Sequence, residues 1–152
     1  MDLDDLHAVA ATEDRLLDGR VRLVQPAGGY RAAIDPVLLA AAVTAQPGQE
    51  ILDVGCGQGA AALCLLARLP EVSVLGLERD AGVAAMASRG AELGGQGARL
   101  RMEVGDLAAL PAALRRQTWP WVMTNPPYHL PAEAPASPVP GRAAANHEEM
   151  GL

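Results

Sequence analysis

Asn125, Pro126, Pro127 and Tyr128 combine side chains that suit chemistry on a flat, nitrogen-containing group. They follow a short apolar run at residues 121–124, which is typical of a buried strand. Open α/β sheets bind ligands at the carboxyl ends of their strands. An asparagine there can accept hydrogen bonds from an amino group, and a tyrosine ring can stack on a planar substrate. Asn-Pro and Pro-Pro pairs are also strong loop signals, so a plain turn explains the motif equally well on its own.

A glycine-rich segment is the second candidate site, and its sequence is Asp53-Val54-Gly55-Cys56-Gly57-Gln58-Gly59. Glycines at three alternate positions let the backbone turn tightly and let a ligand approach closely. Glu78 follows at the end of the next expected strand, where a carboxylate accepts hydrogen bonds from ribose hydroxyls. A tight strand-to-helix turn without a ligand is the alternative interpretation.

Asp53 stands two residues before the first of these glycines, and their spacing is not that of a dinucleotide-binding loop. A carboxylate on the loop repels a pyrophosphate and attracts a cationic amino-acid end. S-adenosylmethionine has such an end, a ribose and an adenine, and no phosphate, so the pattern predicts it as the cofactor. Asp106 follows the third expected strand and is placed to accept a hydrogen bond from the adenine amine. Capping a short helix explains Asp106 equally well.

Strands and helices alternate from residue 50 onwards. We expect strands at residues 50–54, 72–77, 98–104 and 121–124, helices at 59–69 and 80–93, and a short helix after Asp106. This alternation predicts an α/β fold, with a parallel sheet and helices on both faces. Before residue 50 we expect a weakly helical segment over 2–18, a strand over 19–25 and a turn over 26–29. A return strand then begins at Tyr30 and Arg31, and Asp35 caps a helix.

The size of the chain, 152 residues, predicts one globular domain over residues 1–152. We divide it into an N-terminal extension over 1–48, a cofactor-binding core over 49–128, and a proline-rich loop and tail over 129–152. The net charge of −6 argues against a strongly basic nucleic-acid-binding domain. Four arginines in the N-terminal third form either a local phosphate-binding cluster or a solvated face, namely Arg15, Arg20, Arg22 and Arg31.

The cysteines and histidines indicate neither a disulfide framework nor a metal site, because one of the two cysteines lies in the glycine loop and the other in the helix expected after it, and the three histidines are dispersed. Neither a signal peptide nor a stretch long enough to span a bilayer is visible. We therefore expect a cytoplasmic protein without a membrane or metal partner.

The glycine loop, Glu78, Asp106 and the Asn-Pro-Pro-Tyr motif together resemble class I S-adenosylmethionine-dependent methyltransferases that act on exocyclic or amide nitrogens. Residues 19–26, 29–31 and 35–40 look like the bacterial tRNA (adenine-N6)-methyltransferases that act beside the anticodon of valine tRNA. The resemblance implies a Rossmann-like sheet of seven strands. This chain has only the N-terminal strands, about four, preceded by a small β-hairpin and helix extension, so we expect a C-terminally truncated domain.

The resemblance also implies roles for individual residues. The cofactor-binding set is Asp53, Gly55, Cys56, Gly57 and Gly59 around the methionine end, Glu78 at the ribose, Asp106 at the adenine, and Arg31 and Asp35 over the pocket. The catalytic set is Asn125 and the Pro126 carbonyl, which hold the adenine amine, with Pro127 between them and Tyr128, which stacks on the base. The expected substrate partner is a tRNA.

Three functions remain open on the sequence. The first is methylation of the N6 amine of an adenine in tRNA. The second is methylation of a glutamine amide in a protein such as a release factor, since that nitrogen is also planar and delocalised; the segment from Gln25 to Asp35 disfavours it. The third is a non-catalytic module that binds the cofactor or a partner, which the missing strands favour, because the fourth strand leaves an exposed hydrophobic edge.

Overall fold

Four parallel strands form the central sheet of the computed structural model, which describes residues 10–28 and 31–126. The strand order is β5-β4-β3-β6. The strands are β3 (Glu50–Val54), β4 (Ser73–Glu78), β5 (Leu100–Val104) and β6 (Trp121–Thr124). The predicted α/β class with a parallel sheet is confirmed, and each strand lies within two residues of its expected position. Hydrophobic runs separated by glycine and proline carried this prediction, because the inner strands β3 and β4 are buried on both faces. The expectation of a buried strand at residues 121–124 holds for Met123 and is wrong for Val122, which is 56% exposed because β6 forms one edge of the described sheet.

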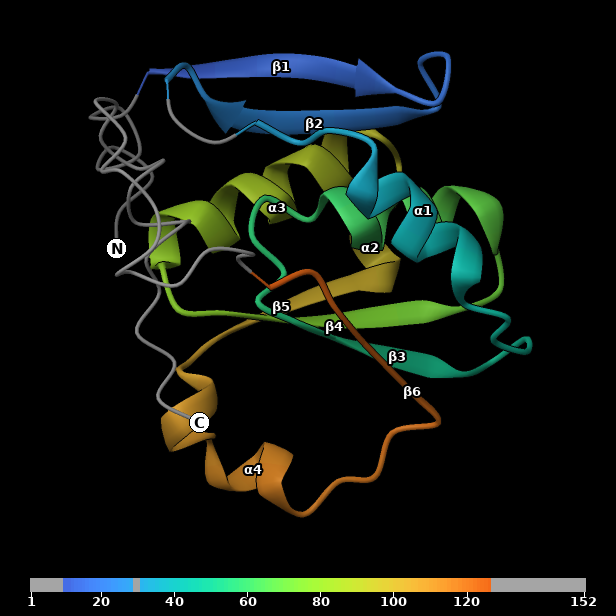
Figure 1. Cartoon of the computed structure of the whole chain (residues 1–152), viewed down its shortest axis with the longest axis vertical. Coiled ribbons are helices and arrows are strands. Elements are labelled where there is room, and N and C mark those ends of the chain that lie inside the picture. The colour runs from blue at the N-terminus through green and yellow to red at the C-terminus, as the bar shows by residue number, and fades with distance from the viewer. Residues whose placement is uncertain (1–9, 29–30, 127–152) are drawn as a thin grey trace.

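Helices cover both faces of the sheet, as predicted (Figure 1). On one face lie α1 (Asp35–Ala42), α2 (Ala60–Arg68) and α3 (Ala81–Leu93). On the other lies the short α4 (Ala112–Arg115), which follows a 3-10 turn at Leu107–Ala109. The N-cap of α1 is Ile34, whose carbonyl accepts the N–H groups of Val37 and Leu38, so the prediction that Asp35 caps this helix is wrong by one residue. Asp35 lies in the first turn instead, where its charge complements the helix dipole.

Two hydrophobic clusters flank the sheet. The larger one lies under the three helices and includes Ile51, Val74, Leu63, Leu66 and Met123. The smaller one faces α4 and includes Leu52, Leu75, Leu77 and Leu114. Every residue of α2 from Ala60 to Leu66 is buried, because this helix lies between the sheet on one side and the N-terminal hairpin on the other.

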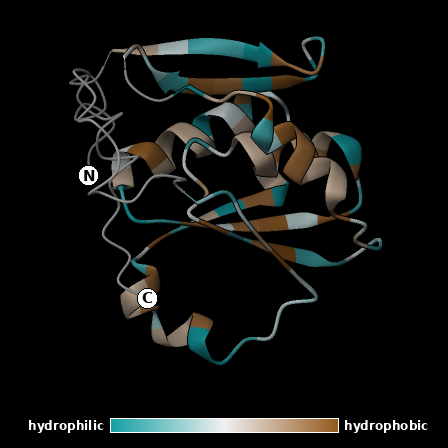
Figure 2. Ribbon diagram, viewed as in Figure 1, coloured by the Kyte–Doolittle hydropathy of each residue, from teal (hydrophilic) through white to brown (hydrophobic). Residues whose placement is uncertain are grey.

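The N-terminal hairpin forms a third layer above the helices and consists of β1 (Ala11–Leu16) and β2 (Val21–Pro26). In Figure 2 the inner strand β2 is more hydrophobic than the outer β1. The prediction of a helical segment over 2–18 is wrong for β1, where half-buried and exposed residues alternate with the period of a strand. The hairpin therefore pairs β2 with the segment before it, and a return strand at Arg31 does not form; Tyr30 lies outside the described residues.

The hairpin packs closely against α3 at Gly90. A Cβ atom added there would lie 2.9 Å from the carbonyl oxygen of Arg22, which is backbone of β2. Real Cβ atoms do not approach that closely, so only glycine lets the strand cross the helix at this distance. On β2 itself, Val21 and Leu23 are fully buried against the helices.

Arginine side chains close the carboxyl ends of two helices. The Arg99 guanidinium donates hydrogen bonds to the carbonyls of Leu66 at 3.0 Å, Leu69 at 3.1 Å and Val72 at 3.3 Å. These carbonyls lack partners within the helix ladder, and a positive charge near them also complements the helix dipole. Arg68 donates in the same way to the carbonyls of Ala40, in the last turn of α1, and of Val43, its C-cap.

We expect Arg99→Ala to lower the free energy of unfolding by about 1–3 kcal/mol, because it leaves three carbonyl groups without this donor. Urea denaturation of the two proteins measures the effect. Arg89→Ala is the matched control, since Arg89 is exposed and makes only a 3.6 Å ion pair with Glu92 on the same helix. Such a pair contributes little, about 0–1 kcal/mol. Equal losses in the two variants would contradict the capping role.

Candidate functional site

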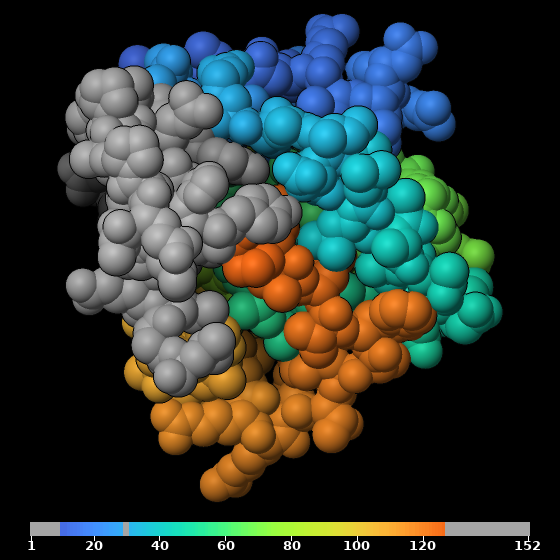
Figure 3. Space-filling view, viewed as in Figure 1, coloured from blue at the N-terminus to red at the C-terminus, as the bar shows by residue number. Residues whose placement is uncertain are grey.

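The carboxyl ends of β3, β4 and β6 meet at one edge of the sheet. Val54 pairs with Leu77 of β4 on one side and with Thr124 of β6 on the other. The Thr124 hydroxyl donates a 2.9 Å hydrogen bond to the Val54 carbonyl, which ties the end of β6 to the start of the glycine loop. On the face shown in Figure 3, the orange end of β6 borders the cyan start of α1.

This joint brings the two sequence motifs together. Asn125 and Pro126 follow Thr124 directly, and Gly55 follows Val54. Asn125 is half-buried and Pro126 is exposed. Pro127 and Tyr128, predicted to complete the catalytic set, lie outside the described residues.

The glycine loop turns sharply because its three glycines have positive φ, at 68° for Gly55, 58° for Gly57 and 82° for Gly59. Other residues rarely adopt this left-handed conformation. A Cβ atom on Gly55 or Gly57 would meet no atom of residues 10–28 and 31–126 within 4 Å, so this part of the chain leaves the surface above the two positions open. A Cβ atom on Gly59 would lie 3.1 Å from the Cβ of Ala87, so Gly59 serves the packing of α2 against α3.

Glu78 holds the loop against the end of β4. One carboxylate oxygen accepts a 2.9 Å hydrogen bond from the Gly57 N–H, and the other accepts one of 2.9 Å from the Asp80 N–H. The backbone of the loop is held as well, because the N–H groups of Gly55 and Cys56 both donate to the Leu77 carbonyl. A carboxylate has about four acceptor positions, so Glu78 can accept further hydrogen bonds from a ligand's hydroxyl groups.

Asp53 is a buried carboxyl group with an unused acceptor. Its side chain is 2% exposed, and its Oδ2 atom has no hydrogen-bond partner within the described part of the chain. The pKa of Asp53 is raised from 3.8 to about 7, mainly by burial; a hydrogen bond from the Cys56 thiol lowers it, and the nearby negative charge of Glu78 contributes to the rise. A buried acid without a cation favours the neutral form near pH 7.

Cys56 packs the loop onto the sheet. Burial raises the pKa of its thiol well above the usual range, so the thiol stays protonated and can donate to Asp53. Its sulfur lies over Gly76 of β4, where an added Cβ would come within 2.7 Å of it and within 2.6 Å of the Met102 sulfur. Sequence reasoning missed Gly76, although an isolated glycine inside a strand is a known sign of close approach. No sequence signal pointed to Thr124.

Asp106 lies beyond β5 at the same edge of the sheet. Its Oδ1 atom accepts a 2.8 Å hydrogen bond from the Ala108 N–H, and so caps the 3-10 turn. The preceding Gly105 donates to the Glu78 carbonyl at 2.9 Å, which holds the end of β5 beside the end of β4. The capping role is therefore present, and it leaves the carboxylate exposed at the edge that carries Glu78.

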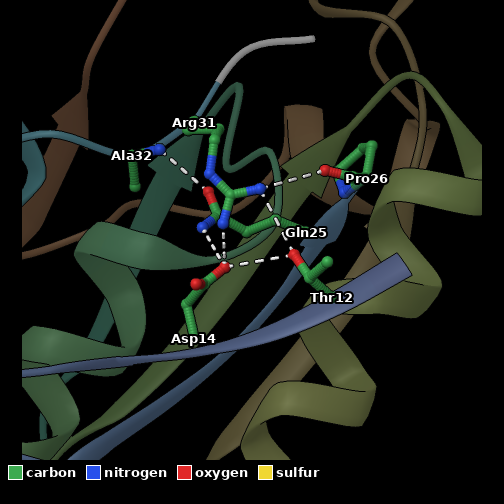
Figure 4. A network of polar contacts seen from close by, with 6 residues as sticks. All are labelled: Thr12, Asp14, Gln25, Pro26, Arg31 and Ala32. Carbon is green, nitrogen blue, oxygen red and sulfur yellow. Dashed lines mark hydrogen bonds and ion pairs between the residues drawn. The ribbon is translucent and has the colours of Figure 1, made fainter. Parts of the chain in front are cut away.

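Arg31 belongs to a polar network beneath the hairpin (Figure 4). Its guanidinium pairs with Asp14 and donates to the Thr12 hydroxyl at 3.2 Å. Gln25, only 3% exposed, donates to Asp14 at 2.9 Å and accepts the Ala32 N–H at 2.8 Å. The hydrogen bond from Gln25 is the main reason that the pKa of Asp14 lies below its ordinary value. The network fixes the segment leading to α1, and cofactor contacts of Arg31 and Asp35 stay predictions.

Other parts of the described surface show fewer features of a binding site. A shallow hollow lies at the opposite, amino edge of the sheet and is lined by Glu50, Gln117, Thr118, Trp119 and Pro120. Among the described residues, His, Cys, Asp and Glu side chains form no group of three or more that could hold a metal ion. In the same part of the chain, no helix is long and apolar enough to cross a membrane.

Comparison with known families identifies the kind of domain to which this sheet and its carboxyl edge belong. The family model for the methyltransferase small domain matches residues 31–137, which include the glycine loop, Glu78, Asp106 and the Asn-Pro-Pro-Tyr motif. The chain belongs to this family. The predicted resemblance to class I methyltransferases is thereby confirmed.

Curated relatives of this methyltransferase domain include tRNA1(Val) (adenine(37)-N6)-methyltransferases. The protein from Yersinia pestis (strain Pestoides F) is 33% identical over 105 residues, covering 68% of this chain and 42% of the relative. The protein of the same name from Yersinia pseudotuberculosis serotype O:3 (strain YPIII) is also 33% identical, with 68% and 41% covered. The chain thus spans about two fifths of the length of these relatives.

Solved structures agree with the fold of the methyltransferase domain. A predicted O-methyltransferase from Agrobacterium tumefaciens is 31% identical, with a TM-score of 0.55 over 62% of this chain and 49% of the other. Coclaurine N-methyltransferase, solved with N-methylheliamine and S-adenosylhomocysteine, is 18% identical, with a TM-score of 0.51 over 59% of this chain and 25% of the other. The second likeness concerns the fold alone.

Proposed function

We propose that this chain binds S-adenosylmethionine at the carboxyl edge of its sheet and serves the transfer of a methyl group to the N6 amine of an adenine in tRNA. The observation that carries the proposal is the joint between Thr124 and Val54, because it places Asn125 beside the open glycine loop. The names of the curated relatives support a tRNA substrate. A tRNA substrate also favours a cytoplasmic location.

The residues at this edge fit the cofactor. The open surface above Gly55 and Gly57 leaves room for a ligand against the backbone. The unused oxygen of Asp53 suits an ammonium group, and Glu78 suits the ribose hydroxyls. When bound, S-adenosylmethionine supplies a methyl group that its sulfonium already activates, so this chain has to place the acceptor rather than activate the donor.

The acceptor needs help because the lone pair of an adenine amine is delocalised into the ring. Hydrogen bonds from that amine to the Asn125 side chain and to the Pro126 carbonyl would favour a more pyramidal nitrogen with an available lone pair. Stacking on Tyr128 would contribute about 1–3 kcal/mol. The base must first leave its stack, which costs a few kcal/mol and less in a loop than in a duplex.

The test is transfer of a labelled methyl group from S-adenosylmethionine to unmodified valine tRNA by the full chain. We expect transfer, and we expect Asn125→Ala to lower its rate about 100-fold, as for the loss of one positioned polar group at a reacting centre. Cofactor affinity should stay within about twofold, because we assign Asn125 to the acceptor base and not to the cofactor. The matched control is Gln117→Ala, at the amino edge of the sheet, which should change neither quantity.

Other outcomes of this experiment separate the remaining candidates. Transfer to release factor instead of tRNA would favour the glutamine methyltransferase. Cofactor binding without transfer to either acceptor would leave a binding module. A chain that does not bind S-adenosylmethionine would contradict the proposal as a whole.

A further inference from the structure

Asp53 occupies a buried position where charge is costly before a ligand binds. It lies on β3, paired in register with Gly76 of β4 and with Met123 of β6. Gly76 has no side chain and Met123 is apolar, so neither neighbouring strand offers a polar partner at this level. Asp53 shares the sheet face of Ile51, which packs against the alanines and leucines of α2.

The ionisable groups that face Asp53 do not compensate its charge. They are the Cys56 thiol on the glycine loop and the Glu78 carboxylate at the end of β4, of which one is neutral and the other negative. Within residues 10–28 and 31–126, the ion pairs of arginine lie elsewhere, on Glu13, Asp14, Glu92 and Glu50. Burial without a cation raises the pKa of Asp53 to about 7.

We infer that a ligand with a cationic amine displaces a proton from the Asp53 carboxyl group when it binds at this site. The inference rests on the proposed function, since S-adenosylmethionine carries its amine at the amino-acid end. The Asp53 O–H bond breaks and its proton goes to bulk water. The unused Oδ2 atom then accepts a hydrogen bond from the ligand's ammonium group.

The release of this proton makes the affinity for the ligand depend on pH. The carboxylate is the form that binds the amine, and its fraction in the free chain rises as the pH rises through about 7. Below that pH, affinity should fall about tenfold for each pH unit, because one proton must leave per ligand bound. Above about pH 8 the ligand's own amine begins to lose its proton, since free α-amino groups titrate near 7.7–8.0. Binding should therefore be tightest between about pH 7 and 8.

Isothermal titration calorimetry of the full chain tests the inference at pH 6, where the amine of the ligand is fully protonated. S-adenosylmethionine is titrated in two buffers with different ionisation enthalpies, so that the difference in heat counts the protons released. We expect close to one proton per ligand. The matched ligand is 5′-methylthioadenosine, which has the adenine, ribose and thioether but no amino-acid end, and should release none.

Asp53→Asn provides the protein control, because an amide cannot release a proton in this range. This variant should bind S-adenosylmethionine at least tenfold more weakly at pH 8, with equal heats in the two buffers. Equal heats in the unaltered chain, with normal binding, would overturn the inference and leave the proposed function standing. Proton release that persists in the variant would also overturn it. No binding of either ligand would instead overturn the proposed function, and the inference with it.

Discussion

Asp53→Asn should stabilise the ligand-free chain at pH 8 by up to about 4 kcal/mol, although it removes a group that we assign to the binding site. The pKa of Asp53 is about 7 in the folded chain and 3.8 for an ordinary aspartate. A shift of one pKa unit corresponds to about 1.4 kcal/mol, so the shift of about three units sets the upper limit. The cause is burial, which makes the charged form costly in the folded state.

The destabilisation caused by Asp53 grows as the pH rises from 3.8 to about 7. Below pH 3.8 the Asp53 carboxyl group is protonated in both the folded and the unfolded chain, and it contributes no penalty. Between pH 3.8 and about 7 the folded chain keeps a proton that the unfolded chain has released, so stability falls as the pH rises. Above about pH 7 Asp53 is ionised in both the folded and the unfolded chain, and the folded chain is destabilised by the full amount.

Urea denaturation of both proteins at pH 4, 6 and 8 measures this effect. The difference in free energy of unfolding between Asp53→Asn and the unaltered chain should grow with pH up to about 7 and then stay constant. Asp106→Asn is the matched control, because Asp106 is exposed and asparagine caps a helix as well as aspartate does. A difference that does not vary with pH would show that Asp53 ionises normally in the folded chain.

An outcome of this kind would show that the site reduces the stability of the free domain in order to keep an acceptor ready for a cation. Groups that bind ligands often destabilise the protein that carries them. A ligand with an ammonium group removes the penalty, since the buried carboxylate then has its opposite charge. Saturating S-adenosylmethionine should therefore raise the midpoint of thermal unfolding more in the unaltered chain than in Asp53→Asn.

Gly90→Val should lower the free energy of unfolding by about 3 kcal/mol or more. Its Cβ would lie 2.9 Å from the Arg22 carbonyl oxygen, and backbone of a paired strand cannot move aside as a flexible side chain can. Overpacking of this kind costs about 1–3 kcal/mol, and a β-branched residue adds crowding within the helix. The hairpin should separate from α3, which would expose Val21 and Leu23.

Circular dichroism during urea denaturation gives the loss of stability, and proteolysis within the hairpin reports its separation from α3. Gly82→Ala, in the first turn of the same helix, is the matched control. An added Cβ at Gly82 approaches only the Asp80 side chain, at 3.2 Å, so this variant should be neutral or more stable by up to about 1 kcal/mol. If the Gly90 and Gly82 variants had equal stability, the close packing of hairpin and helix would not contribute as argued.

The sequence by itself determined the order and type of the elements from residue 50 onwards, the class of fold and the family. Apolar runs such as residues 72–77 are readable because the inner strands of a parallel sheet are buried on both faces. The glycine loop and Glu78 are readable because positive φ values and a position at the end of a strand demand particular residue types. Each of these constraints acts on residues that are close together in the chain, so a short stretch of sequence is enough to reveal it.

Only the tertiary structure decided which segments meet. It paired β2 with β1 rather than with a segment at Arg31, and it joined Asp14, Gln25 and Arg31, which are far apart in the sequence, in one polar network. It placed β6 beside β3, which brings Asn125 to the glycine loop. It also left Asp53 buried without a cation. Burial and charge compensation depend on every element packed around a side chain, so no stretch of sequence determines them locally.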